Sequence, residues 1–249
     1  MDYEEPLFFE VIRHAVAADR DVIEMVSGSP DWEPPSGVRE GLREYADADP
    51  GEFAYSPSEG LRELREEIAA RRNVPADQVL ITNGTCEANY LAMARALERD
   101  AGDEVVLVDP VYPYYPGRVS LLGGTRRFVA AEPDGSLDPE RVRAAVGDDT
   151  ACLVVNTPNN PTGAVYSPDT VAQLVEIAEA ADALLIADEV YDHFDYSGTF
   201  ESALAVDSEH RVVTSGFSKA MAITGWRVGY AVFPEPLVDG AVTRHMLTN

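Results

Sequence analysis

Lysine occurs once in this chain, at position 219, although the chain has 19 basic residues. A lysine amine loses its proton near neutral pH when it is buried or lies beside other charges, and the free amine then forms a Schiff base with a carbonyl group. A guanidinium stays protonated and is a poor nucleophile. Lys219 is therefore the first candidate for a catalytic residue. A single lysine can also remain by chance, so the residues around Lys219 must decide between the two explanations.

The turn Thr82-Asn83-Gly84-Thr85 precedes a predicted helix, and the free N–H groups at a helix start can bind a phosphate. An ordinary turn at a helix start explains the same residues equally well. A Walker-type loop is excluded because it needs Gly-Lys-Ser/Thr, whereas Lys219 follows Ser218. No GxGxxG pattern follows the first predicted strand, so a dinucleotide-binding turn is excluded there too.

Short apolar segments alternate with helical patterns from Val79 onward, which favours a largely parallel sheet covered on both faces. We therefore expect an α/β fold with a mostly parallel, seven-stranded sheet in residues 51–249. The predicted strands are Val79–Thr82, Glu104–Val108, Arg126–Ala130, Ala151–Val155, Ala183–Ala187, Arg211–Thr214 and Val228–Val232, and the predicted helices between them are Glu87–Glu98, Arg141–Val146 and Thr170–Ala181.

The first fifty residues have a different pattern. Phe8–Ala18 is predicted to form a helix, and the Pro- and Gly-rich segment Ser27–Gly37 is predicted to be a loop.

Polar segments follow five of the predicted strands, at the end of each strand where open α/β sheets bind their ligands. Several loops therefore converge on one site, which is more typical of an enzyme than of a scaffold. These segments are Asn83-Gly84-Thr85, Asp109-Pro110, Asn156–Gly163, Asp188–Tyr191 and Ser215–Lys219.

The chain is strongly acidic, with 44 acidic against 19 basic residues and a formal net charge of -25. Such a surface repels nucleic acid and anionic membranes, so neither is an expected partner. It also repels itself, and salt screens that repulsion. A protein adapted to a high-salt cytoplasm, a halophilic-like acidic protein, should therefore melt at a higher temperature in molar KCl; an unchanged melting temperature would indicate an ordinary acidic protein.

The remaining composition narrows the class further. The acidic opening lacks the basic and then apolar layout of a signal peptide, and no apolar run is long enough to cross a bilayer, so we expect a cytoplasmic protein. Cys86 and Cys152 form no CxxC pair, and the four histidines show no metal-ligand spacing. We expect no disulfide and no metal site.

Three segments together resemble the class I and II aminotransferases of fold type I, enzymes that use pyridoxal 5'-phosphate (PLP). They are Pro158–Gly163 (PNNPTG), Asp188–Tyr191 (DEVY) and Ser215–Tyr230 (SGFSKAMAITGWRVGY). Further matching segments, from about Gly28 onward, lie in the family's order, including Tyr55 with Gly60 and Asp109–Pro113. The resemblance covers nearly the whole chain.

The resemblance implies roles at the reactive end of the cofactor. Lys219 would hold PLP as a Schiff base and move a proton, and Asp188 would face the pyridine nitrogen. Tyr191 and Asn160 would hydrogen-bond the phenolic oxygen, and Tyr112 would stack on the ring. Gly28 and Asn160 would lie near the substrate, which would be an amino acid or a 2-oxo acid.

The resemblance also implies a phosphate site. Arg227 would bind the phosphate, and the backbone around Gly84, Thr85 and Cys86 would form a cradle with Ser218. Tyr55 would reach the phosphate in the neighbouring subunit of a homodimer. Many relatives have serine where this chain has Gly216, so Ser215 or Ser218 could compensate.

A second departure concerns length. The family continues past Asn249, so the resemblance implies that residues 1–50 form an N-terminal arm and substrate-side loop belonging to an incomplete small domain. Residues 51–249 would be the PLP-binding domain, and the C-terminal small domain, with the arginine that binds the substrate carboxylate, would be absent. The chain would then be a fragment, or a partner polypeptide would supply the rest.

The leading hypothesis is a PLP-dependent aminotransferase that moves an amino group between an L-amino acid and a 2-oxo acid. A PLP-dependent C–S lyase of the same fold is an alternative, because the fold does not decide which substrate bond breaks. An inactive truncated relative is another. A PLP-binding domain of a transcriptional regulator is disfavoured, since no basic DNA-binding segment precedes it.

Overall fold

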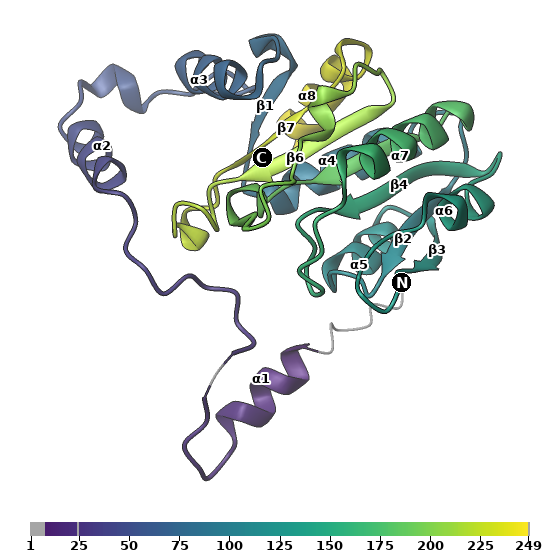
Figure 1. Ribbon diagram of the computed structural model, residues 1–249. Coiled ribbons are helices and arrows are strands. Elements are labelled where there is room, and N and C mark those ends of the chain that lie inside the picture. Colours follow the sequence, from purple (N-terminus) through teal and green to yellow (C-terminus); the bar gives the residue numbers. More distant parts are fainter. Residues whose placement is uncertain (1–7, 24, 249) are drawn as a thin grey trace.

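The computed structural model describes residues 8–23 and 25–248. Its centre is one seven-stranded sheet in the order β1-β7-β6-β5-β4-β2-β3, in which β7 alone runs antiparallel to its neighbours (Figure 1). The predicted α/β class and the mostly parallel sheet are confirmed. The strands are β1 (Val79–Thr82), β2 (Glu104–Asp109), β3 (Thr125–Ala130), β4 (Thr150–Asn156), β5 (Leu184–Asp188), β6 (Arg211–Gly216) and β7 (Gly229–Val232).

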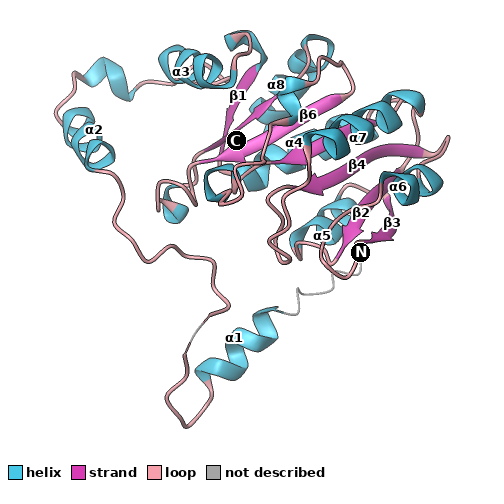
Figure 2. Cartoon of the chain, in the orientation of Figure 1, coloured by secondary structure: helices cyan, strands magenta, loops and turns pink. Residues whose placement is uncertain are grey.

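Helices cover both faces of the sheet (Figure 2). One apolar core joins the sheet to α3 (Arg62–Arg72), α6 (Pro139–Ala145) and α7 (Pro168–Ala180). The other core joins it to α4 (Thr85–Leu97), α5 (Tyr114–Leu121) and α8 (Glu235–Thr248). The remaining helices are α1 (Phe8–Val16), α2 (Ser36–Ala46) and the short 3-10 turns η1 (Pro50–Phe53), η2 (Ala76–Gln78), η3 (Asp192–Phe194), η4 (Ala203–Ala205) and η5 (Thr224–Trp226).

The central strands are mostly apolar because both of their faces are covered. Every residue of β4, β5 and β6 is buried. Helix α7 begins where Ser167 accepts a hydrogen bond from the Thr170 amide, and Pro168 occupies its first turn. No helix within the two described segments of the chain is long and apolar enough to span a membrane.

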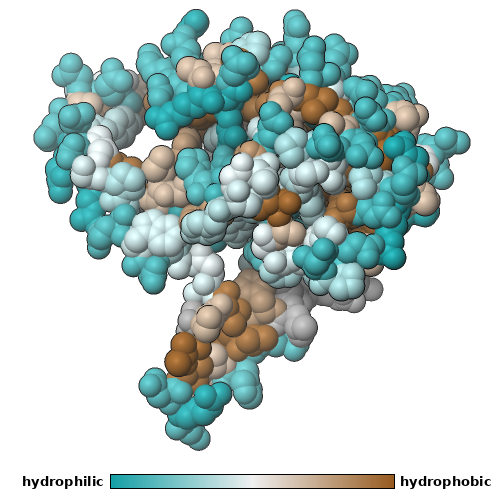
Figure 3. All heavy atoms as spheres, viewed as in Figure 1, coloured by the Kyte–Doolittle hydropathy of each residue, from teal (hydrophilic) through white to brown (hydrophobic). Residues whose placement is uncertain are grey.

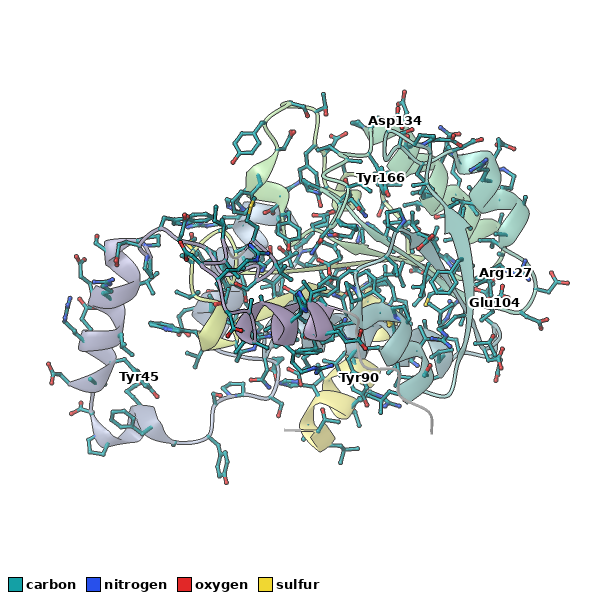
Figure 4. All side chains as sticks on the ribbon, turned by 90° about the horizontal axis from the view of Figure 1, so that it is seen from below. Tyr45, Tyr90, Glu104, Arg127, Asp134 and Tyr166 are labelled. Atoms are coloured by element: carbon teal, nitrogen blue, oxygen red, sulfur yellow. The ribbon has the colours of Figure 1, made fainter. Side chains whose placement is uncertain are left out.

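At the outer edge of the sheet, charged pairs replace apolar contacts. Arg127 on β3 donates to Glu104 on β2 with an Nε–Oε2 distance of 2.9 Å, and the two side chains lie next to each other in Figure 4. The edge strand β3 is largely exposed, so its polar side chains face water.

Several predicted boundaries need correction. The predicted loop Ser27–Gly37 was wrong at its end, because α2 begins at Ser36. The helix predicted to run to Ala18 ends at Val16. Helices α2, α3, α5 and α8 were not predicted. Helix α3 is rich in arginine and glutamate and buries only part of one face, while α5 contains a proline and a glycine in eight residues.

Residues 8–50 lie apart from the helix-covered sheet, with α1 at the lower end of the view in Figure 1. Apolar side chains are exposed along α1 and the segment after it, which form the brown patch at the bottom of Figure 3. The largest exposures are those of Val16, Ile23 and Met25, each above 80%. The arm contacts the sheet domain at several points. The rings of Phe8 and Phe9 lie 5.7 and 6.4 Å from the ring of Tyr114, the ring of Trp32 lies 5.8 Å from that of Phe194, and the Gly28 carbonyl accepts a hydrogen bond from Lys219.

A buried ionic network ties α3 to the loop after β5. The Arg72 guanidinium donates to Glu189 at 3.2 Å, to the Tyr230 hydroxyl at 2.7 Å and to Asp192. Ser202 and the Ala203 amide also donate to the Glu189 carboxylate. Burial raises the pKa of Glu189 to about 7, and Arg72 opposes that rise.

We expect Arg72→Met to destabilise the protein by about 3–5 kcal/mol, because it leaves a buried carboxylate without its cation. The raised pKa makes the folded state favour the protonated carboxyl, so wild-type stability should fall as pH rises from about 4.5 to about 7. Protonation removes the unpaired charge, so the variant should lose less at pH 5 than at pH 8. Urea midpoints at the two pH values measure both effects. Equal losses, or no recovery when Glu189→Gln is added, would contradict this role.

Candidate active site

An open cavity of about 150 Å³ lies at the carboxyl edge of the sheet. The sheet order changes direction between β4 and its neighbour β2, which is where α/β sheets bind ligands. Four predicted site residues from the reactive end line this cavity: Tyr112, Asp188, Tyr191 and Lys219. Four more line it from the predicted phosphate end: Thr85, Cys86, Ser218 and Arg227.

Asp188 is the last residue of β5, and its side chain is held firmly. It is 3% exposed, and Oδ2 accepts hydrogen bonds of 2.7 Å from both Asn89 Nδ2 and Tyr115 Oη. Oδ1 accepts from the Val190 amide at 3.1 Å. Burial raises the pKa of Asp188, while these donors and the charge of Arg118 lower it. The cavity therefore has a fixed carboxylate on its wall.

Lys219 follows β6, and its amine lies across the cavity from the sheet. Nζ donates to the Gly28 carbonyl at 2.6 Å and lies 5.9 Å from the centre of the Tyr191 ring. Burial lowers the pKa of Lys219, and the nearby Arg227 lowers it further. Both effects increase the fraction of free amine near neutral pH, as Schiff-base chemistry requires.

Three polar side chains form a chain of hydrogen bonds beside the lysine. The Asn156 side chain donates to the Asp188 carbonyl at 2.9 Å, and its oxygen accepts from the Asn160 amide at 2.7 Å. Asn160 Nδ2 then reaches the Tyr191 hydroxyl at 3.4 Å. Burial raises the pKa of Tyr191, and the contact with Asn160 lowers it. From the end of β4, Asn156 thus contacts the backbone of both Asp188 and Asn160 and positions these two predicted site residues.

Helix α4 points its N-terminus into the cavity. The helix begins at Thr85, and its first amides have no carbonyl partner one turn earlier within the helix. Arg227 lies over this start, with Nη2 3.4 Å from the Asn83 carbonyl and Nη1 2.7 Å from the Thr224 carbonyl. A Cβ at Gly229 would lie 2.5 Å from the Thr85 amide nitrogen, so only glycine lets β7 approach the helix this closely. A helix start of this kind, with a guanidinium over it, can bind an anion.

Gly216 is explained by its neighbour Thr85. A Cβ at position 216 would lie 2.6 Å from Thr85 Oγ1, so the threonine hydroxyl occupies the space beside the glycine. That hydroxyl is buried and has no hydrogen-bond partner among the described residues. Ser215 cannot take over the phosphate side, because its side chain donates to the Glu189 carbonyl and lines a different cavity with Arg72. Ser218 lines the site cavity.

The other predicted residues have mixed outcomes. Gly28 lies at the Lys219 amine, and Gly84 lies under the Arg227 guanidinium. Tyr112 is half-buried, with its ring 5.3 Å from that of Tyr115, and burial raises its pKa. Tyr55 is fully exposed and does not line the cavity.

Sequence reasoning missed the residues that support the site from its helices. Asn89 and Tyr115 fix Asp188, and Arg118 lines the cavity from α5. A usable signal was present, because Asn89 follows Thr85 by four residues on α4, which places both on one helix face. Likewise Tyr112, Tyr115 and Arg118 are spaced by three residues.

Comparisons with known proteins agree with this geometry. The family model "Aminotransferase class I and II" matches residues 20–247. The aspartate/prephenate aminotransferase of Thermus thermophilus is 36% identical over 226 residues, covering 88% of this chain and 58% of that protein. The structure of the aspartate aminotransferase from Thermotoga maritima superposes with a TM-score of 0.87 at 31% identity, covering 99% of this chain and 68% of that one.

A solved alanine aminotransferase from Pyrococcus furiosus also superposes, with a TM-score of 0.87 at 31% identity over 98% of this chain and 66% of that chain. The chain spans just under three fifths of the length of the curated relatives that it matches. The matched region includes the sheet, the α4 start, Asp188, Lys219 and Arg227. This chain belongs to the class I and II aminotransferases.

Proposed function

We propose that this chain catalyses transamination between an L-amino acid and a 2-oxo acid. The observation that carries the proposal is one cavity in which the only lysine, with a lowered pKa, lies with a buried aspartate and a helix start covered by an arginine. Enzymes of this family use PLP as their cofactor.

The residues present fit this cofactor at three points. Asp188 offers a fixed carboxylate to a protonated pyridine nitrogen, and a buried carboxylate needs such a partner. The α4 start, Arg227 and the unpartnered Thr85 hydroxyl offer donors to a phosphate. Lys219 offers its amine to the aldehyde. When bound, PLP supplies an electron sink for negative charge at the substrate α-carbon.

Each residue then has a defined task. Lys219 Nζ holds and moves the proton at the substrate α-carbon, since its lowered pKa favours the free amine as a base. Tyr191 and Asn160, whose side chains are within hydrogen-bonding distance of each other, would donate hydrogen bonds to a cofactor oxygen near the lysine. Tyr112 would pack on the cofactor ring, and Gly28 would bound the substrate space beside the amine.

We further propose that residues 51–249 form the cofactor-binding domain and residues 1–50 an arm on the substrate side. The exposed Tyr55 is available to a second copy of the chain, which supports a homodimer with shared sites. In that case, affinity for PLP should rise with protein concentration in wild type. Phenylalanine at position 55 should weaken that affinity at high concentration; an affinity independent of both would argue against a shared site.

Two similar relatives are named as an aspartate/prephenate aminotransferase and an aspartate aminotransferase, so we propose L-aspartate as the first donor to test. Protein loaded with PLP is mixed with L-aspartate, L-glutamate or L-alanine, and the absorbance and the 2-oxo acid are followed. A transaminase gives the aminated cofactor and one equivalent of 2-oxo acid. In a parallel sample L-cysteine is added, and release of ammonia and pyruvate from it would instead indicate a C–S lyase. An unchanged spectrum with every amino acid would count against transamination.

A further inference from the structure

Arg118 on α5 is a buried cation that the function proposed above does not use. It is 8% exposed and lines the same cavity as Lys219 and Asp188. Its guanidinium carbon lies 5.9 Å from the ring centres of both Tyr114 and Tyr115, so the aromatic rings hold the side chain in place. Its Nη2 faces Cys86 Sγ.

The Arg118 guanidinium has a hydrogen-bond donor that no described residue accepts from. Nη1 is buried and has no hydrogen-bond partner within residues 8–23 and 25–248. Among the described residues, no carboxylate forms an ion pair with it within 4.0 Å, whereas the part-buried Arg72 has two such carboxylate partners. A buried charge is normally paired, because an unpaired one destabilises the folded state by roughly several kcal/mol. A buried, unpaired guanidinium facing a cavity therefore indicates an anionic ligand.

The position of Arg118 identifies which part of a ligand it faces. Arg227 contacts Asn83 and lies against Gly84, just before helix α4, and Arg118 contacts Cys86, the second residue of that helix. The two guanidinia thus bracket Thr85 and the helix start. A phosphate monoester carries about two negative charges and several acceptor oxygens, which suits two arginines better than one.

We propose that Arg118 is a second phosphate-binding arginine of the cofactor site, acting opposite Arg227 across the start of α4. The proposal rests on the proposed function, because the phosphate is that of PLP. The field of Arg118 extends along the cavity, since it also lowers the pKa of Asp188 and of Tyr112. The Cys86 sulfur is a weak partner for this guanidinium, and the phosphate oxygens would replace or supplement that contact.

The test compares two aldehydes that differ only in the phosphate. Dissociation constants of PLP and of pyridoxal are measured by the visible band in wild type, Arg118→Met and Arg227→Met. Methionine keeps an unbranched, apolar side chain that can pack beside the two tyrosine rings, and it removes the charge. We expect Arg118→Met to reduce the preference for PLP over pyridoxal by about tenfold to a hundredfold, the effect of one charged hydrogen-bonding group. Arg118→Lys should restore part of it.

Three outcomes would overturn the proposal. If Arg118→Met weakened the binding of PLP and of pyridoxal equally, Arg118 would only support the fold. If Arg118→Met left the preference for PLP unchanged while Arg227→Met reduced it, Arg227 alone would bind the phosphate. A preference that is kept, with a raised KM for aspartate, would assign Arg118 to a substrate carboxylate instead.

A second measurement separates this inference from the proposed function. Inorganic phosphate should raise the melting temperature of wild type, and the rise should be smaller in Arg118→Met, whether or not PLP binds. If wild type binds neither aldehyde but phosphate protects it through Arg118, the anion site stands and the transaminase proposal fails. If phosphate protects both proteins equally, the role of Arg118 is refuted even when PLP binds normally.

Discussion

Replacing Lys219 with alanine is expected to abolish the visible band that PLP gives with this protein and to slow the half-reaction with L-aspartate by about a thousandfold or more. The physical reason is that Lys219 is the only lysine in the chain, so no neighbouring side-chain amine can replace it. Its free-amine form is favoured by burial and by Arg227.

Lys219→Arg is the matched control for charge. It keeps a cation at the same place but has no nucleophilic amine, so it should fail as fully as the alanine variant. Absorbance spectra and single-turnover rates measure both variants. If Lys219→Arg kept the band, or if either variant kept its half-reaction rate, the lysine would have no covalent role.

The second large effect is expected at Asp188. Asp188→Asn keeps the shape and the hydrogen bonds with Asn89 and Tyr115 but removes the charge that would face a protonated pyridine nitrogen. Loss of one member of a buried charge pair should slow the half-reaction by roughly a hundredfold to a thousandfold. Single-turnover rates at saturating PLP separate this slowing from weaker binding.

Asp134→Asn is the control for this experiment, because Asp134 is exposed on a turn and does not line the cavity. It should react at the wild-type rate. If Asp188→Asn also reacted at the wild-type rate, Asp188 would be a structural residue that only anchors α4 and α5 to the sheet.

The positions of Asp188 and Lys219 could be predicted because both lie close to the end of a strand. Asp188 is the first polar residue after the apolar run of β5, and Lys219 lies three residues beyond the end of β6. Parallel strands then bring those ends to one edge of the sheet. The segment around Lys219 also carries the family resemblance.

The roles of Tyr115 and Arg118 could not be predicted in this way. Both lie on α5, a helix of eight residues with Pro116 and Gly117 inside it, and such residues normally argue against a helix. Its tertiary packing against the sheet overrides that local preference. The sequence also could not show that the Thr85 hydroxyl occupies the space beside Gly216, since this depends on a contact between residues 131 positions apart.

The path of the N-terminal arm could not be predicted from the sequence for a different reason. Residues 8–50 have few buried side chains, so no apolar periodicity fixes their course, and the predicted loop overran the start of α2. The family resemblance implied that Gly28 lies near the substrate, and its contact with the Lys219 amine was not predicted.

The most direct test of the central claim is to trap the cofactor on the protein and map the attachment. PLP is added, the adduct is reduced with borohydride, and the digested protein is analysed by mass spectrometry. With one lysine in the chain, the α-amino group of the N-terminus is the only competing amine. The structure predicts one stoichiometric pyridoxyl group on the peptide that contains Lys219. A label found only at the N-terminus, or none at all, would contradict the assignment of this cavity as a PLP site.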